Sequence, residues 1–157
     1  MASWTTIDAV VGEVPGFARG GVISDTQIAT WIVTVSQSVA GALLRRGLPL
    51  DEAEWPAAGQ SGMPTGSSTL EMITRLGAAA TLAAAVAAQF TAGEFHLAKV
   101  LQRRYEDELK ALRAGDYDKL FRAAAATIET GGQLAVGDQT DPDTGEDTTA
   151  FRKEDVF

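Results

Sequence analysis

The stretch from Ser24 to Gly47, SDTQIATWIVTVSQSVAGALLRRG, contains both a helix start and a helix stop, and it decides the fold class. Ser24 and Gln27 form a capping-box pattern, in which each side chain bonds a backbone N–H that the first helical turn leaves without a partner. Apolar residues then follow at spacings of three and four, namely Ile28, Trp31, Ile32, Val35, Val39, Ala42 and Leu43. This spacing predicts a helix that turns one apolar face toward a core.

The end of this helix is equally marked. Arg45 and Arg46 lie in the last turn, where positive charge suits the negative end of the helix dipole, and Gly47 ends the helix. Residues 48–68 are rich in proline and glycine, so we expect a long connection without regular structure. Loops of this length are usually functional or docked, and Trp55 is the residue expected to dock it.

Three further helices are predicted from start signals and apolar spacing. Capping boxes at Ser68–Glu71 and Thr91–Glu94 begin an alanine-rich helix and a heavily charged helix, and Asp116 caps a shorter one that Gly131 closes. The charged helix is expected to bury Phe95, Ala98, Leu101, Tyr105, Leu109 and Leu112. A short helical turn is expected over 7–11. The sequence therefore predicts an all-α fold, a small bundle of about four helices.

The C-terminal residues differ in composition from the rest. Residues 131–157 carry seven acidic and two basic residues, a net −5 out of the chain's −8, and few large apolar groups. Such a segment cannot bury enough surface to offset the entropy of ordering by itself. We therefore expect a helical domain over 1–132 and an extended acidic arm over 133–157.

The same charge balance bears on partners. A protein that grips DNA phosphates needs an excess of Lys and Arg to displace counterions, so a DNA-binding helix-turn-helix is disfavoured. The N-terminus lacks the basic region of a signal peptide, which predicts folding in a cytoplasm. The most apolar run, residues 76–88, is shorter than the roughly 20 residues of a membrane span, so we expect no membrane insertion.

No constellation for catalysis is found. Cysteine is absent, and His96 is the single histidine, two residues from Glu94 rather than at the Glu-x-x-His spacing of di-iron helices. The carboxylates of residues 106–108 are interleaved with bases, as on a solvated face. We expect no enzyme activity and no cofactor.

A calcium site is the sharpest metal hypothesis. Asp138, Asp141, Asp143, Gly145, Glu146 and Asp147 place oxygens around a glycine, but the EF-hand spacing fails because glycine stands fifth from Asp141 and no Glu stands twelfth. An acidic turn is the better interpretation, and we expect no metal.

Several features together resemble the head-tail connector proteins of tailed bacteriophages, also called head completion or adaptor proteins. They are a Thr5-x-x-Asp8-x-Val10 start before a Pro/Gly loop, a helix ending Leu44-Arg45-Arg46-Gly47, an alanine-rich helix, a Tyr105-x-x-x-Leu109 helix, and an ending, FRKEDVF, of aromatic, basic and acidic residues.

The resemblance implies a small helical protomer without catalytic activity, assembled in the bacterial cytoplasm as a homo-oligomeric ring, typically of twelve copies. Such a ring lies beneath the portal in the virion neck. One face of the ring binds the portal protein, and the other binds the next head-completion, stopper or tail protein. Double-stranded DNA passes through the lumen of the ring without specific binding. The C-terminal segment of such proteins is commonly an arm that reaches the portal or a neighbouring subunit.

Two sets of interface residues follow. The predicted partner-binding residues are Phe151, Arg152, Lys153, Val156 and Phe157, in a segment whose composition is typical of peptides that fold on a partner. Arg103 and Arg104 are candidates for salt bridges between subunits, although ion pairs within the helix would explain them equally well. The competing function is a non-phage helical binding module or small regulator that docks a partner through Trp31, Trp55 or the C-terminal segment.

Overall fold

The structure, a computed structural model, describes residues 3–56, 64–88 and 95–122, and all regular structure within them is helical. The chain divides into two units, Met1–Ala124 and Ala125–Phe157, and the described residues all belong to the first. The all-α prediction is therefore confirmed for these residues. The elements are α1 (Ile7–Gly12), α2 (Asp25–Arg45), the 3-10 helix η1 (Glu52–Glu54), α3 (Gly66–Ala87), α4 (Phe95–Ala114) and α5 (Asp118–Phe121).

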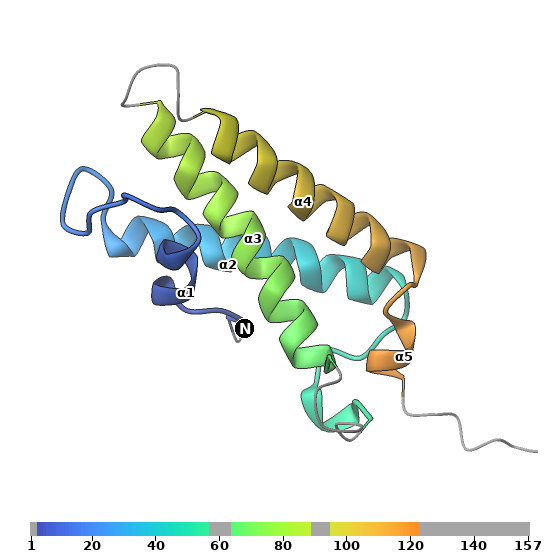
Figure 1. The fold of residues 1–157 in the computed structure, drawn as a ribbon. Helices are drawn as coiled ribbons and strands as arrows, with labels where there is room; N and C mark the ends of the chain where they lie inside the picture. Colours follow the sequence, from blue (N-terminus) through green and yellow to red (C-terminus); the bar gives the residue numbers. More distant parts are fainter. Residues whose placement is uncertain (1–2, 57–63, 89–94, 123–157) are drawn as a thin grey trace, which may run out of the picture. The chain divides into compact units, whose positions relative to one another are not determined.

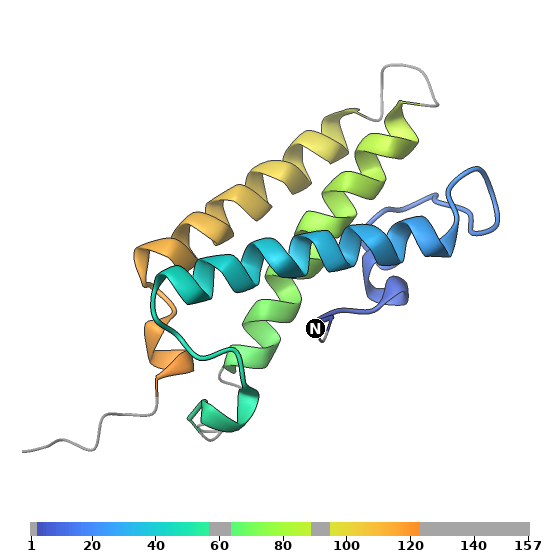
Figure 2. The ribbon, with the colours of Figure 1, turned by 180° about the vertical axis from the view of Figure 1, so that it is seen from behind.

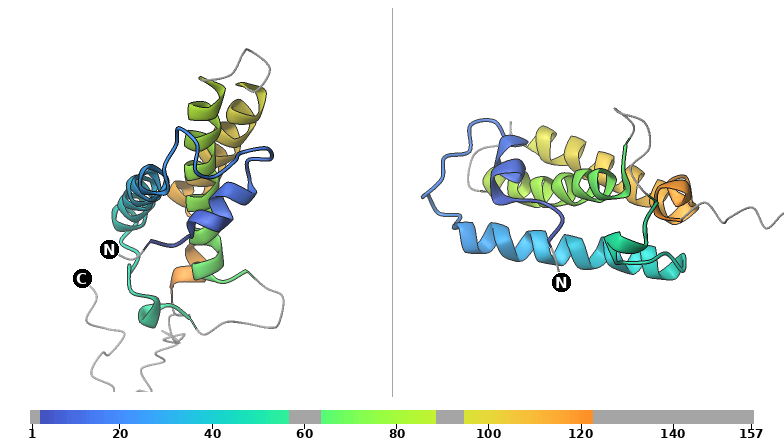
Figure 3. Two further views of the ribbon diagram at one scale, coloured as in Figure 1. Left: turned by 90° about the vertical axis from the view of Figure 1, so that its left-hand side faces the viewer. Right: turned by 90° about the horizontal axis from the view of Figure 1, so that it is seen from below.

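The three long helices form two layers. Helices α3 and α4 lie side by side and run in opposite directions, and α3 makes its most extensive contacts with α4 and then with α2 (Figure 1). Helix α2 crosses the pair on one face, as Figure 2 shows from behind. The view from below in Figure 3 separates α2 from the α3–α4 layer, and α1 contacts both α3 and α2. Helix α3 thus makes more extensive contacts with α2 and α4 than these two make with each other.

The crossing depends on one glycine of α3. A Cβ atom built on Gly77 would stand 2.7 Å from Val35 Cγ1 of α2 and 2.8 Å from the ring of Tyr105 of α4. Real Cβ atoms are essentially never found so close to other heavy atoms, so the absence of a side chain at Gly77 lets three helices meet at one point. The run of buried alanines that follows, Ala78, Ala79, Ala80 and Ala83, keeps neighbouring helices close along the rest of α3.

Two clusters of buried side chains fill the space around α3. The first joins the N-terminal half of α2 to α1 and the second half of α3, and includes Val10, Ile28, Ile32 and Leu82. The second joins the rest of α2 to α3, α4 and α5, and includes Val39, Leu43, Leu70, Ile73, Leu112 and Phe121. All seven residues of the predicted α2 stripe are buried or partly buried and belong to these clusters. The apolar face of α2 therefore spans both halves of the core.

The predicted boundaries of α2 are confirmed. Ser24 is the N-cap, and both hydrogen bonds of the capping box with Gln27 are present. At the other end Gly47 has φ +65°, and the N–H of Leu48 donates to the carbonyl of Leu43 over 3.0 Å. This is the left-handed C-terminal geometry that glycine adopts without steric cost.

Two expectations about residues 48–68 are wrong. The segment contains η1, and α3 begins at Gly66 rather than after Ser68, because Thr65 rather than Ser68 is the N-cap. The Thr65 hydroxyl accepts a hydrogen bond from the N–H of Ser68, and the Ser68 hydroxyl accepts one from the N–H of Thr65. A Ser thus replaces the Glu expected at the third position of the capping box.

Trp55 docks the connection as predicted. Its ring stands edge-to-face against Phe121 with the ring centroids 5.1 Å apart, and its Nε1–H donates to the carbonyl of Pro49 over 3.2 Å. The start of α3 lies close by, because a Cβ atom on Gly66 would come within 2.9 Å of both rings. The connection after α2, the start of α3 and α5 are therefore held together by one aromatic contact.

The prediction for the last helix is wrong at its start. Asp116 does not cap α5, whose N-cap residue is Tyr117 and has no side-chain capping bond. Asp118 instead pairs with Arg46 over 2.7 Å, which ties α5 to the end of α2. The predicted continuation to Gly131, the capping box at Thr91–Glu94 and the domain boundary at 132/133 lie outside the described residues.

Helices α2 and α3 are both long and apolar enough, by length and composition alone, to cross a membrane. The expectation based on residues 76–88 missed this because it considered only the most apolar run. In the structure, 44% of the relevant window of α2 and 61% of that of α3 are buried against the rest of the protein, and core helices of soluble proteins pass the same test.

The Gly77 contact can be tested against a second helical glycine. We expect Gly77→Ala to destabilise the protein by about 1–3 kcal/mol, because the added methyl overpacks the crossing. Gly41→Ala in α2, where a Cβ meets nothing within 4 Å, is expected to stabilise by about 0.5–1 kcal/mol through helix propensity. Urea denaturation followed by circular dichroism measures both. Equal stabilisation by the two substitutions would contradict the proposed close approach.

Candidate interaction surface

The outward face of α2 is uncharged. No Asp, Glu, Lys, Arg or His occurs between Asp25 and Arg45, although much of this face is exposed. The hydroxyls of Thr30, Thr34 and Ser38 each donate to the carbonyl four residues earlier, over 2.9, 3.0 and 3.2 Å. Because these donors are already bonded within the helix, covering this face leaves none of the three without a partner.

Two apolar side chains on the same helix add to this face. Val33 and Leu44 are 44% and 59% exposed. Single exposed apolar residues are common on protein surfaces. Here two of them lie on a helix surface that is uncharged along its length. We call this surface, comprising Thr26, Thr30, Val33, Thr34, Gln37, Ser38, Gly41 and Leu44, the α2 face.

Helix α4 presents the opposite chemistry. Its apolar residues Ala98, Leu101, Leu109 and Leu112 are buried as predicted, Tyr105 is partly buried, and the remaining surface is densely charged. The exposed charged residues are Lys99, Arg103, Arg104, Glu106, Asp107, Lys110 and Arg113.

Arg103 and Arg104 are both exposed on α4, and within the described residues neither forms an ion pair. The intrahelical pairing considered for them is therefore not seen there. Glu106 and Lys110 stand four apart on the same helix but form no ion pair within the described residues, and the Glu106 carboxylate accepts a hydrogen bond from the Gln102 amide over 2.7 Å. Within the described part of the chain, Arg103 and Arg104 are thus exposed and outside any ion pair.

Arg46 and Arg75, by contrast, each pair with a carboxylate of another element. Arg46 bonds Asp118, and Arg75 lies 3.0 Å from Glu13 and 3.7 Å from Glu71. These pairs join α2 to α5 and α1 to α3. Arginines that hold elements together thus have carboxylate partners, whereas those of α4 face outward.

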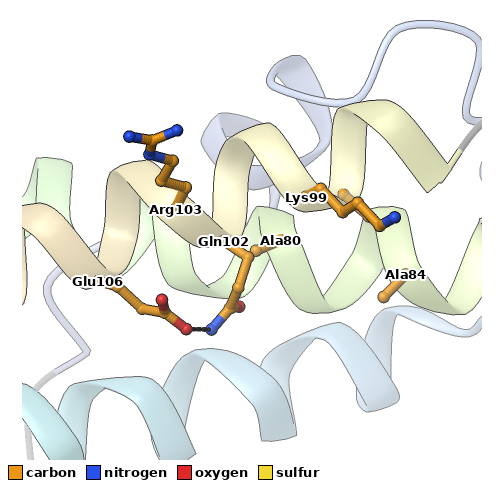
Figure 4. Close-up of a pocket in the computed structure, with 7 residues that line it drawn as sticks. Ala80, Ala84, Lys99, Gln102, Arg103 and Glu106 are labelled. Atoms are coloured by element: carbon orange, nitrogen blue, oxygen red, sulfur yellow. Dashed lines mark hydrogen bonds between the residues drawn. The ribbon is translucent and has the colours of Figure 1, made fainter.

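A pocket of about 340 Å³ lies between α3 and α4. Figure 4 shows alanines of α3 at its base and longer polar side chains of α4 around it. Its lining residues are Ala80, Ala84, Ala98, Lys99, Gln102, Arg103 and Glu106. Of the two arginines predicted at an interface, the structure brings Arg103 to this pocket, while Arg104 is not among its lining residues. We call this site the α3–α4 pocket.

Sequence reasoning missed the α3–α4 pocket. Two patterns could have indicated it: Ala80 and Ala84 stand four apart on α3, and Lys99 and Arg103 stand four apart on α4, so each pair shares one helix face. Which faces oppose each other depends on how the helices pack, and the spacing within one helix carries no such information.

The predicted partner-binding residues Phe151, Arg152, Lys153, Val156 and Phe157 lie outside the described residues, as do the acidic residues 138–147 weighed as a calcium site. His96 is exposed at the start of α4. Within residues 3–56, 64–88 and 95–122 no group of three or more His, Asp or Glu side chains is placed to hold a metal ion.

The Tyr117 side chain is bonded to Glu108 and has a raised pKa. The Tyr117 hydroxyl donates to the Glu108 carboxylate, and this hydrogen bond, with partial burial and the negative charge of Glu108, raises the pKa of Tyr117 to about 12. Burial also raises the pKa of Tyr105, which lies against Gly77 at the helix crossing. The Tyr117 bond links the end of α4 to the turn before α5.

Comparison of the chain with protein-family models, with curated proteins and with solved structures finds no match.

The Tyr117 bond predicts a specific pH dependence. The pKa of Tyr117 in the folded protein exceeds its ordinary value of 10.0, so the protonated hydroxyl favours the folded state, fully below pH 10 and progressively less as the pH rises toward 12. We expect Tyr117→Phe to cost about 1 kcal/mol at pH 8. This difference from the wild type should shrink between pH 10 and 12.

Chemical denaturation of both proteins across this range measures the effect. Taking the difference removes the contribution of Tyr105, which both proteins retain. A difference that stays constant up to pH 12 would show that the hydroxyl does not bond to Glu108 in solution.

Proposed function

We propose that this chain is a structural head-tail connector of a tailed phage, which forms a ring beneath the portal in the virion neck. The observation that carries the proposal is the contrast between two exposed helix faces, the uncharged α2 face and the densely charged surface of α4. A ring of identical copies requires heterologous contacts, in which two different surfaces of each protomer meet. A protomer with two chemically distinct faces suits such an assembly.

The charges support the same function. Arginines that join elements of the scaffold are paired internally, whereas Arg103 and Arg104 form no ion pair within the described part, which is compatible with salt bridges to a neighbouring copy. The net charge of −8 suits a protein past which DNA slides, because phosphates are repelled rather than gripped. The partners are then further copies of the chain, about twelve by resemblance, the portal protein, and the next neck or tail protein.

The alternative function is a non-phage binding module, which would dock a partner through Trp31, Trp55 or the C-terminal segment. Trp31 and Trp55 were its expected docking residues, and both are partly buried in the protein's own packing. Trp55 uses its N–H and its ring within the scaffold. A partner would have to bind through their remaining edges, so this candidate depends more heavily on the C-terminal segment.

Deletion of residues 150–157 tests the proposal. The buried clusters of the described part are formed by residues between Trp4 and Phe121, so we expect helical content and melting temperature to change little. Attachment to portal rings should be abolished, because the deletion removes both aromatic anchors. Circular dichroism and co-sedimentation with purified portal protein measure the two effects.

A substitution control keeps the chain length constant. Phe151→Ser with Phe157→Ser should reduce co-sedimentation as strongly as the deletion, whereas Thr148→Ala with Thr149→Ala should leave it unchanged. If the deletion instead unfolds the protein, the segment belongs to the protomer's own core. Full attachment by the double serine variant would contradict the assigned role of the aromatic residues.

A further inference from the structure

The α3–α4 pocket combines an apolar base with a positively charged rim. Ala80 and Ala98 are buried at its base, and Lys99 and Arg103 are exposed beside them. Four residues of helix separate the two cationic positions by about 6 Å along the axis. Figure 4 shows both side chains extending from the same helix, with Ala80 and Ala84 on the facing one. The pocket therefore combines apolar contact with two cationic side chains that leave α4 at positions one turn apart.

The charges of this rim are not neutralised within the described residues. Lys99 and Arg103 form no ion pair there, in contrast to Arg46 and Arg75 of the scaffold. Glu106, the carboxylate that lines the pocket, is bonded to Gln102 over 2.7 Å. Within the described residues, no carboxylate thus lies in ion-pair contact with Lys99 or Arg103.

We propose that the α3–α4 pocket binds a short acidic peptide segment of a partner protein. In an extended peptide, alternate residues lie about 6.6 Å apart on one side, close to the rise of about 6 Å between the backbone positions of Lys99 and Arg103 on α4. Two carboxylates on that side meet the two cations, and the intervening apolar side chain turns to the opposite side, toward the alanines. Charge complementarity sets the register, and apolar burial adds affinity that exposed ion pairs alone do not supply.

Other classes of ligand fit this pocket less well. Nucleic acid is disfavoured because it presents a long row of phosphates that requires an excess of Lys and Arg, whereas Lys99 and Arg103 are the two cations among the lining residues of this pocket. A small molecule is usually enclosed over most of its surface, whereas Ala84, Lys99, Gln102, Arg103 and Glu106 are all exposed here. An open site with a linear pair of charges suits a peptide. The inference uses only the chemistry of the pocket and does not rest on the proposed function.

The test uses the full-length protein and a short dye-labelled peptide of alternating glutamate and valine, with binding followed by fluorescence anisotropy. We expect saturable binding that weakens as salt is raised and is lost with a peptide of alternating glutamine and valine. Lys99→Ser and Arg103→Ser should each weaken binding about fivefold, the upper range for an exposed ion pair. Both residues are exposed, so circular dichroism should show an unchanged fold.

Arg104→Ser is the matched control, because Arg104 is the next residue on the same helix, equally charged and exposed, but outside the pocket. It should change the affinity less than twofold. Equal weakening by all three substitutions would overturn the proposal, since it would show diffuse attraction to a charged helix. Binding seen only after removal of residues 138–157, or only as dimers dissociate, would assign the pocket to the chain's own acidic segment or to a second copy and would also overturn it.

Discussion

The absence of a side chain at Gly77 is the constraint on which the rest of the structure depends. Val35 of α2 and Tyr105 of α4 both approach α3 at this residue, closer than a Cβ atom permits. Alanines bury little apolar area each, so the alanines of α3 contribute through close approach, whereas Leu70, Ile73 and Leu82 of the same helix fill the core. Larger side chains of α2 and α4 pack against α3. The α2 face and the charged side of α4 point away from this contact and are exposed.

Local signals predicted much of this fold. Ser24, Gln27 and Gly47 set the ends of α2 through hydrogen bonds between residues near in sequence, and such patterns are readable without tertiary information. The start of α3 was misplaced because Ser68 resembles an N-cap. In the structure its hydroxyl accepts from the N–H of Thr65, which is itself the cap. Composition alone does not show whether Thr65 or Ser68 is the residue that caps the helix.

The interaction surface was less predictable than the fold. The sequence indicates that Arg103 and Arg104 are exposed and charged. It does not indicate that Arg103 alone lines the α3–α4 pocket, because only the packing of α4 on α3 places Arg103 beside Ala80 and Ala84. Likewise, Trp55 was recognised as a docking residue, while its contact with Phe121, 66 positions along the chain, followed from tertiary structure. Spacing within a helix predicts which residues share a face, and packing decides what that face meets.

The helical chain buries its own core, pairs the arginines that hold its elements together and exposes two unlike faces, which we propose contact copies of itself and its partners. Electron microscopy of the protein mixed with purified portal rings tests the account most directly. We predict an additional ring of density on one face of the portal, formed by copies related by rotation about the ring axis and in contact through two different surfaces. Bare portal rings alongside monomeric protein would contradict it.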